Sequence, residues 1–86
     1  MFSANVIIPN ETGLHARPAS GLVQLSKDFK SKIEIHYKTK IIDAKSIINV
    51  MAGGLSQHAE IEVTACGEDE QAAGQAIVSY IENLRD

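Results

Sequence analysis

The chain has 86 residues, a formal net charge of −3 and a hydrophobic fraction of 44%, with no Trp and only two Phe and two Tyr. This length predicts a single domain over residues 1–86 with one mainly aliphatic core. No surplus of Lys and Arg exists to neutralise phosphates, which argues against a nucleic-acid partner. No apolar run reaches the length of a membrane span, and no stretch resembles a signal peptide. With a single cysteine and hence no internal disulfide, we expect a cytoplasmic protein.

The first third of the chain predicts a strand, a loop and a helix. Alternating apolar and polar residues predict a strand over residues 2–8, and the composition of residues 9–13 indicates a loop. Helical spacing of apolar residues predicts a helix from about Ala16 to Lys27. Pro18 fits its first turn, where the missing N–H leaves no hydrogen bond unmade. The inward stripe of this helix is expected to consist of Ala19, Leu22, Val23, Ser26 and Phe29.

The middle of the chain predicts two short strands and a short helix. Residues 32–37 and 40–44 alternate, with a tight turn at Lys38-Thr39 that lacks the Asn-Gly preferred in two-residue hairpins. Ser46 is placed to cap a helix over residues 47–52. Gly53-Gly54 ends that helix, because one glycine can adopt the left-handed conformation.

The last third predicts a strand and a final helix. Residues 59–66 alternate, and acidic residues 68–70 favour the start of a helix. Its apolar stripe comprises Ala73, Ile77, Tyr80 or Ile81, and Leu84. Gly74 lies inside this helix, at a cost of about 1 kcal/mol relative to Ala.

The element order β-α-β-β-α-β-α predicts an α+β fold. Four mostly antiparallel strands with three helices on one face form a two-layer, open-faced sandwich. The other face of the sheet is polar enough to contact water. Its residues are expected to be Ser3, Asn5, Glu34, His36, Glu60, Glu62 and Thr64.

His15 is the first candidate functional residue. The free N–H groups at a helix N-terminus form an anion site, Arg17 can bind the same anion, and Gly13 permits a close approach of the backbone. A neutral imidazole there could also act as a nucleophile in phosphoryl transfer. Two interpretations are open: a surface histidine that merely caps the helix, or an anion or phosphoryl site.

Ser46 and the short helix that follows form a second candidate. A capping serine is also a position where an added phosphate gains from the helix dipole. Ile47, Ile48 and Met51 cannot all be buried by so short a helix, so some must be exposed. Those that are exposed are either scattered apolar residues of the kind found on any protein surface, or an apolar docking patch.

The remaining reactive side chains indicate no site. His36, His58 and Cys66 lack metal-ligand spacing, so we expect no metal and no cofactor. Cys66 is expected to be a partly buried strand residue with no neighbour that activates it.

Two segments of the chain carry a recognisable pattern: residues 12–19, Thr-Gly-Leu-His-Ala-Arg-Pro-Ala, and residues 44–51, Ala-Lys-Ser-Ile-Ile-Asn-Val-Met. With these segments the sequence resembles a known family, HPr, the histidine phosphocarriers of the bacterial phosphoenolpyruvate-dependent sugar phosphotransferase system. The first segment resembles the active-centre motif of the family, and the second resembles its regulatory-serine segment. Residues 67–70 resemble the start of its last helix, and the similarity extends over essentially the whole chain.

The resemblance implies a phosphocarrier without turnover of its own. His15 would accept a phosphoryl group through Nδ1 from phospho-enzyme I and pass it to IIA domains of sugar permeases. Ala16 and Arg17 would bind the phosphoryl group. The resemblance also implies one docking surface for these partners, made of Ala16, Ser20, Lys27, Ile47, Ile48 and Met51.

A regulatory role follows from the same resemblance. In Gram-positive-type members an HPr kinase/phosphorylase modifies the serine that corresponds to Ser46, and the product acts with the regulator CcpA. The alternative is a mainly regulatory protein of the Crh type, although Crh lacks the histidine found here as His15. We expect His15 and Ser46 to cap helices at the same edge of a monomer. Ser20, Asn49 and Gly53 depart from common family residues and would reshape the docking surface.

Overall fold

Within residues 1–85, seven elements follow one another in the predicted order, and their bounds agree with the predicted ones to within a residue or two. The computed structural model describes residues 1–85. The elements are β1 (Phe2–Ile7), α1 (Ala16–Lys27), β2 (Lys32–Tyr37), β3 (Lys40–Asp43), α2 (Ile47–Ala52), β4 (Glu60–Cys66) and α3 (Glu70–Glu82). The Lys38-Thr39 turn is confirmed, and it needs no glycine because Lys38 itself takes a positive φ of 56°.

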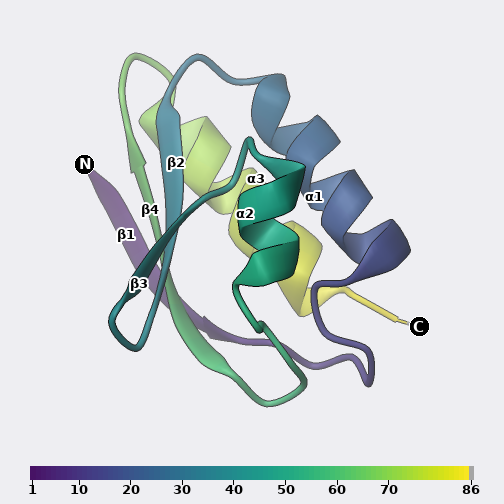
Figure 1. Cartoon of the computed structure of the whole chain (residues 1–86). Coiled ribbons are helices and arrows are strands. Elements are labelled where there is room, and N and C mark those ends of the chain that lie inside the picture. The colour runs from purple at the N-terminus through teal and green to yellow at the C-terminus, as the bar shows by residue number, and fades with distance from the viewer. Residues whose placement is uncertain (86) are drawn as a thin grey trace.

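The strands form one antiparallel sheet in the order β1-β4-β2-β3. The central strand β4 pairs with β1 through Phe2↔Ala65 and with β2 through Ile33↔Ala65. All three helices cover the same face of this sheet (Figure 1). The predicted open-faced α+β sandwich is therefore confirmed.

The core lies between the sheet and the helices. From α1, the inward residues Ala19, Leu22, Val23 and Ser26 are all buried. Phe29 is only half-buried, because α1 ends at Lys27 and Phe29 belongs to the turn beyond it. In α3, Ile81 rather than Tyr80 is fully buried.

Two residues of the sheet differ from the prediction in their exposure. Thr64 was expected in contact with water, but it is buried. Its Oγ1 lies 3.3 Å from His36 Nε2, so the imidazole on the neighbouring strand shields it. Cys66 was expected to be partly buried, but it is exposed at the very end of β4.

Helices α1 and α2 lie side by side and run in opposite directions (Figure 1). At one end, the Leu14 N–H donates to Leu55 O at 2.8 Å, which joins the start of α1 to the segment after α2. At the other end, Lys45 Nζ donates to Phe29 O at 2.7 Å, which joins the start of α2 to the segment after α1. The expectation that His15 and Ser46 cap helices at the same edge is therefore wrong. Antiparallel packing places the two N-termini at opposite ends of the pair.

Candidate functional site

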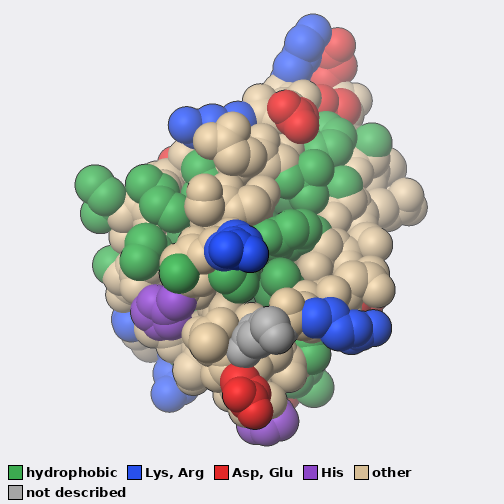
Figure 2. All heavy atoms as spheres, turned by 90° about the vertical axis from the view of Figure 1, so that its right-hand side faces the viewer, with side chains coloured by type: hydrophobic (Ala, Val, Ile, Leu, Met, Phe, Trp, Pro, Cys, Tyr) green, Lys and Arg blue, Asp and Glu red, His purple; other side chains and the backbone are tan. Residues whose placement is uncertain are grey.

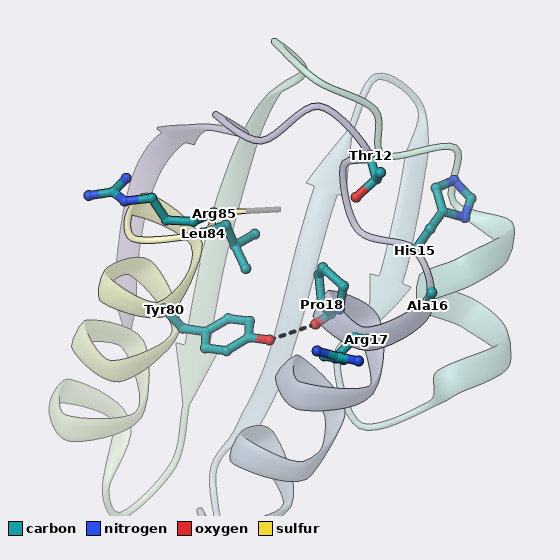
Figure 3. Close-up of a pocket in the computed structure, with 8 residues that line it drawn as sticks. All are labelled: Thr12, His15, Ala16, Arg17, Pro18, Tyr80, Leu84 and Arg85. Atoms are coloured by element: carbon teal, nitrogen blue, oxygen red, sulfur yellow. Dashed lines mark hydrogen bonds between the residues drawn. The ribbon is translucent and has the colours of Figure 1, made fainter.

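His15 occupies the N-cap position of α1. Its backbone is extended, with φ −127° and ψ 160°, and its side chain makes no capping hydrogen bond. The side chain is exposed. The ring points outward from the start of the helix (Figure 3). Both ring nitrogens are therefore available for chemistry instead of helix capping.

The backbone just after His15 takes an uncommon conformation. Ala16 has a φ of +49°, a left-handed value that non-glycine residues rarely adopt. A left-handed residue followed by helical ones turns successive N–H groups toward one side, which creates an anion-binding concavity. Pro18 contributes no N–H, so the donors at this helix start are the backbone N–H groups of Ala16 and Arg17. These donors belong to the two residues that directly follow His15 in the chain.

The loop before His15 is held from two directions. Asn10 Nδ2 donates to Gly13 O at 2.9 Å, and Leu14 is fully buried. Gly13 has a φ of +67°, and a Cβ at this position would overlap the carbonyl oxygen of Leu55. The glycine thus permits both the turn and the close approach of the loop that follows α2. His15 is consequently presented from a fixed backbone.

A hollow of about 510 Å³ lies between the start of α1 and the end of α3. Its lining residues are Thr12, His15, Ala16, Arg17, Pro18, Tyr80, Leu84 and Arg85. Figure 3 shows the His15 ring and the Arg17 guanidinium pointing in different directions from the helix start. Among residues 1–85, none of those that line the hollow is acidic. The lining thus carries an imidazole, two guanidinium groups and backbone N–H donors, and Figure 3 shows the Arg85 guanidinium on the opposite side of the hollow from His15.

The second candidate region consists of Ser46 and α2, and its helix cap and exposed apolar residues agree with the prediction from the local sequence. Ser46 is the N-cap of α2, and its Oγ accepts hydrogen bonds from the backbone N–H of Asn49 at 3.2 Å and from Asn49 Nδ2 at 3.3 Å. Of the apolar residues in α2, Val50 is buried. Ile47, Ile48 and Met51 are 39%, 77% and 42% exposed.

The residues proposed from the family resemblance for docking all lie on the surface. Ala16, Ser20 and Lys27 on α1 are exposed, as are Ile47, Ile48 and Met51 on the neighbouring α2. Figure 2 shows this side of the molecule, where hydrophobic side chains gather on the left of the view beside a histidine. The two helices therefore present an apolar surface next to an imidazole.

Comparison with known proteins identifies the family. The model described as the PTS HPr component phosphorylation site matches residues 2–83. The chain belongs to the HPr family. It therefore has the phosphocarrier fold of that family, as its sequence motifs predicted.

Solved structures of HPr and Crh proteins resemble the chain. HPr-C-His from Thermoanaerobacter tengcongensis is 41% identical with a TM-score of 0.92, over 95% of this chain and 92% of that chain. HPr from Bacillus anthracis is 31% identical with a TM-score of 0.89, over 93% and 95% of the two chains. The catabolite repression protein Crh of Bacillus subtilis, in a domain-swapped dimer, is 38% identical with a TM-score of 0.77, over 84% and 83%.

Five residues that line the hollow were not predicted as site residues: Thr12, Pro18, Tyr80, Leu84 and Arg85. Three of them come from the C-terminal end of the chain, where local pattern predicted only a helix stripe. They reach the site because α3 packs beside α1 (Figure 3). No local signal could have found them, since that packing depends on the whole fold.

Two further properties of the described part of the chain concern membrane-spanning helices and clusters of metal-binding side chains. Within residues 1–85, no helix is long and apolar enough to cross a bilayer. The same part of the chain contains no group of three or more His, Cys, Asp or Glu side chains that could hold a metal ion.

Proposed function

We propose that this HPr-family protein carries a phosphoryl group on His15 in a phosphoenolpyruvate-dependent sugar phosphotransferase system. The observation that carries the proposal is the uncapped His15 ring beside the N–H donors at the start of α1. The ring nitrogen Nδ1 attacks the phosphorus of phospho-enzyme I and forms a P–N bond. The donor's bond to phosphorus breaks, and its electron pair leaves with enzyme I. A IIA domain then attacks the same phosphorus, and His15 leaves as the free imidazole.

The helix start stabilises the phosphoryl group. The phosphoryl oxygens carry negative charge and accept hydrogen bonds from the backbone N–H groups of Ala16 and Arg17, reinforced by the helix dipole. Arg17 supplies a full positive charge, and a planar guanidinium suits a phosphoryl group. In Figure 3 the Arg17 side chain points away from the imidazole. To bind the phosphoryl group on His15, it must therefore turn toward the ring when that group arrives.

We propose that partners dock on the exposed surface of α1 and α2 in the cytoplasm. Enzyme I and the IIA domains would use the same residues in turn, so each contact must be modest and short-lived. The docking residues are Ala16, Ser20, Lys27, Ile47, Ile48 and Met51. The chemistry begins and ends on other proteins, so the chain acts as a carrier and not as an enzyme.

The test is phosphorylation with enzyme I and labelled phosphoenolpyruvate, followed by acid treatment. We expect an acid-labile label on the wild type and none on His15→Ala. His58→Ala is the matched control, because His58 is another exposed histidine, distant in sequence from α1. Label retained in His15→Ala, or no label on a folded wild type, would refute the proposal.

A second candidate function is regulation through Ser46. Two observations favour it: Ser46 is half-exposed at the start of α2, and a Crh protein is 38% identical to the chain. Incubation with ATP and an HPr kinase/phosphorylase should give an acid-stable label that Ser46→Ala abolishes. The modified form would then bind a CcpA-type regulator. If the kinase labels Ser46→Ala equally, Ser46 is not the modified residue.

A further inference from the structure

Tyr80 connects the last helix to the first turn of α1. Its hydroxyl donates a hydrogen bond to the carbonyl oxygen of Pro18 at 2.8 Å (Figure 3). The ring is half-buried and packs against the core. Burial also raises the pKa of Tyr80 above its ordinary value, so the hydroxyl keeps its proton at neutral pH and remains a donor.

Gly21 makes room for this contact. It lies one turn after Pro18 in α1, and a Cβ there would overlap the Tyr80 hydroxyl oxygen and lie 3.1 Å from its Cζ. A glycine inside a helix is unfavourable relative to alanine because its backbone loses more entropy on folding. The contact therefore depends on two matched residues: a tyrosine on α3 and a glycine on α1.

The bonded carbonyl lies next to the uncommon backbone of the site. Pro18 is two residues after Ala16, whose φ is +49°. A non-glycine residue keeps such a conformation only where the surrounding structure imposes it. Before His15, the backbone is held by the bond from Leu14 to Leu55. After Arg17, it is held by the bond from Tyr80 to Pro18. Residues 15–17 thus span the distance between two anchors that come from distant parts of the chain.

We propose that Tyr80 is a positioning residue for His15: its bond to Pro18 fixes the first turn of α1 and so maintains the left-handed Ala16 and the N–H donors beside the imidazole. Tyr80 acts through the backbone and not by contact with the phosphoryl group. The consequence for catalysis rests on the proposed carrier function, whereas the consequence for the Ala16 backbone does not.

The first test replaces Tyr80 by Phe, which keeps the ring and removes only the hydroxyl. In the unphosphorylated protein, the three-bond coupling between the N–H and Hα protons of Ala16 should move toward the value for an ordinary helical residue. The kcat for phosphoryl transfer from phospho-enzyme I should fall about fivefold, the effect of one lost neutral hydrogen bond. The KM should change much less than kcat, because all the docking residues except Ala16 lie outside the altered residues 15–17. Tyr37→Phe, in the other half-buried tyrosine, is the control and should change neither quantity.

A second test removes the contact from the α1 side. Gly21→Ala in the wild type should displace the Tyr80 hydroxyl and reproduce the changes in Ala16 coupling and in kcat. In the Tyr80→Phe background the hydroxyl is already absent, so adding Gly21→Ala should change both quantities much less. A loss of global stability alone would not give this pattern, because each variant is assayed well below its unfolding temperature.

The outcomes separate the inference from the proposed function. An unchanged Ala16 coupling in Tyr80→Phe overturns the inference. A changed coupling with an unchanged kcat overturns the role in catalysis. If enzyme I phosphorylates neither the wild type nor the variants, the carrier function fails, and the Ala16 coupling still decides whether Tyr80 holds this backbone.

Discussion

The Asp69 carboxylate accepts two hydrogen bonds from Ser31, one from its backbone N–H at 2.9 Å and one from its hydroxyl at 2.5 Å. A third comes from the backbone N–H of Lys30 at 2.8 Å. Asp69 is the N-cap of α3, and Ser31 lies directly before β2. This carboxylate therefore joins the start of the last helix to the start of an inner strand.

Asp69 should make stability depend on pH in the acid range. Its hydrogen bonds, first that of the Ser31 hydroxyl, lower the pKa from 3.8 to about 2. Because the folded pKa lies below the unfolded one, the contribution is fully present above about pH 4 and is lost as pH falls toward 2. Urea unfolding of wild type and Asp69→Asn should differ at neutral pH, with the difference shrinking below pH 4. A difference that stays constant from pH 7 to pH 2 would contradict this linkage.

Gly13→Ala should be strongly destabilising. A left-handed alanine costs about 1–2 kcal/mol. The new Cβ would also overlap Leu55 O and weaken the bond from Leu14, for a total of about 2–3 kcal/mol in the free energy of unfolding. Gly54→Ala is the matched control, because Gly54 has a φ of +68° but its nearest neighbour, Lys40 Nζ, lies 3.7 Å away. Equal losses in the two variants would mean that backbone conformation, not the close approach, is decisive.

Gly74→Ala should destabilise the protein although alanine is the better helix former. Helix propensity alone favours the substitution by about 1 kcal/mol. A Cβ on Gly74 would overlap the ring of Phe2, and overpacking typically costs about 1–3 kcal/mol. We expect a net loss of about 1 kcal/mol in urea unfolding. In a Phe2→Leu background, where the ring is absent, the same substitution should be neutral or stabilising. A gain in the wild-type background would show that Phe2 moves aside freely.

Ser46→Asp should slow the phosphorylation of His15 by enzyme I. The two residues occupy the N-cap positions of antiparallel helices and so lie at opposite ends of the pair. The shorter helix, α2, is about 9 Å long, comparable to the screening length at physiological salt. The added charge should therefore act on partner docking and raise the KM, with less effect on kcat. Ser46→Asn is the control, because Asn caps helices as well as Asp does but carries no charge. Added salt should reduce the effect of the Asp variant. Equal rates for the Ser46→Asp variant and the wild type would refute the prediction.

The sequence predicts those features that depend on neighbours along the chain. The spacing of Leu22 and Val23 predicts α1, and the capping preference of Ser46 predicts the start of α2. His15 at a helix start follows from residues 13–18 alone. These interpretations agree with the structure because helix caps and stripes are local.

The features that sequence reasoning missed depend on distant contacts. The burial of Thr64 comes from His36 on a neighbouring strand, and Tyr80 reaches Pro18 only once α3 packs beside α1. The prediction that His15 and Ser46 lie at the same edge is wrong for the same reason, because the packing of α1 against α2 depends on distant contacts. Gly74 looked unfavourable until the position of Phe2 explained it.

The position of β4 in the sheet has a consequence for how the protein is made. Both β1 and β2 pair with β4, which is the last strand to be synthesised. Contacts so remote in sequence form slowly, because a long loop must close before they stabilise anything. A ribosome-bound chain that stops before Glu60 therefore displays His15 without the sheet that supports it. The nascent protein should acquire its site late and in one cooperative step, after both Glu60–Cys66 and the following helix Glu70–Glu82, which carries Tyr80, have left the ribosomal tunnel.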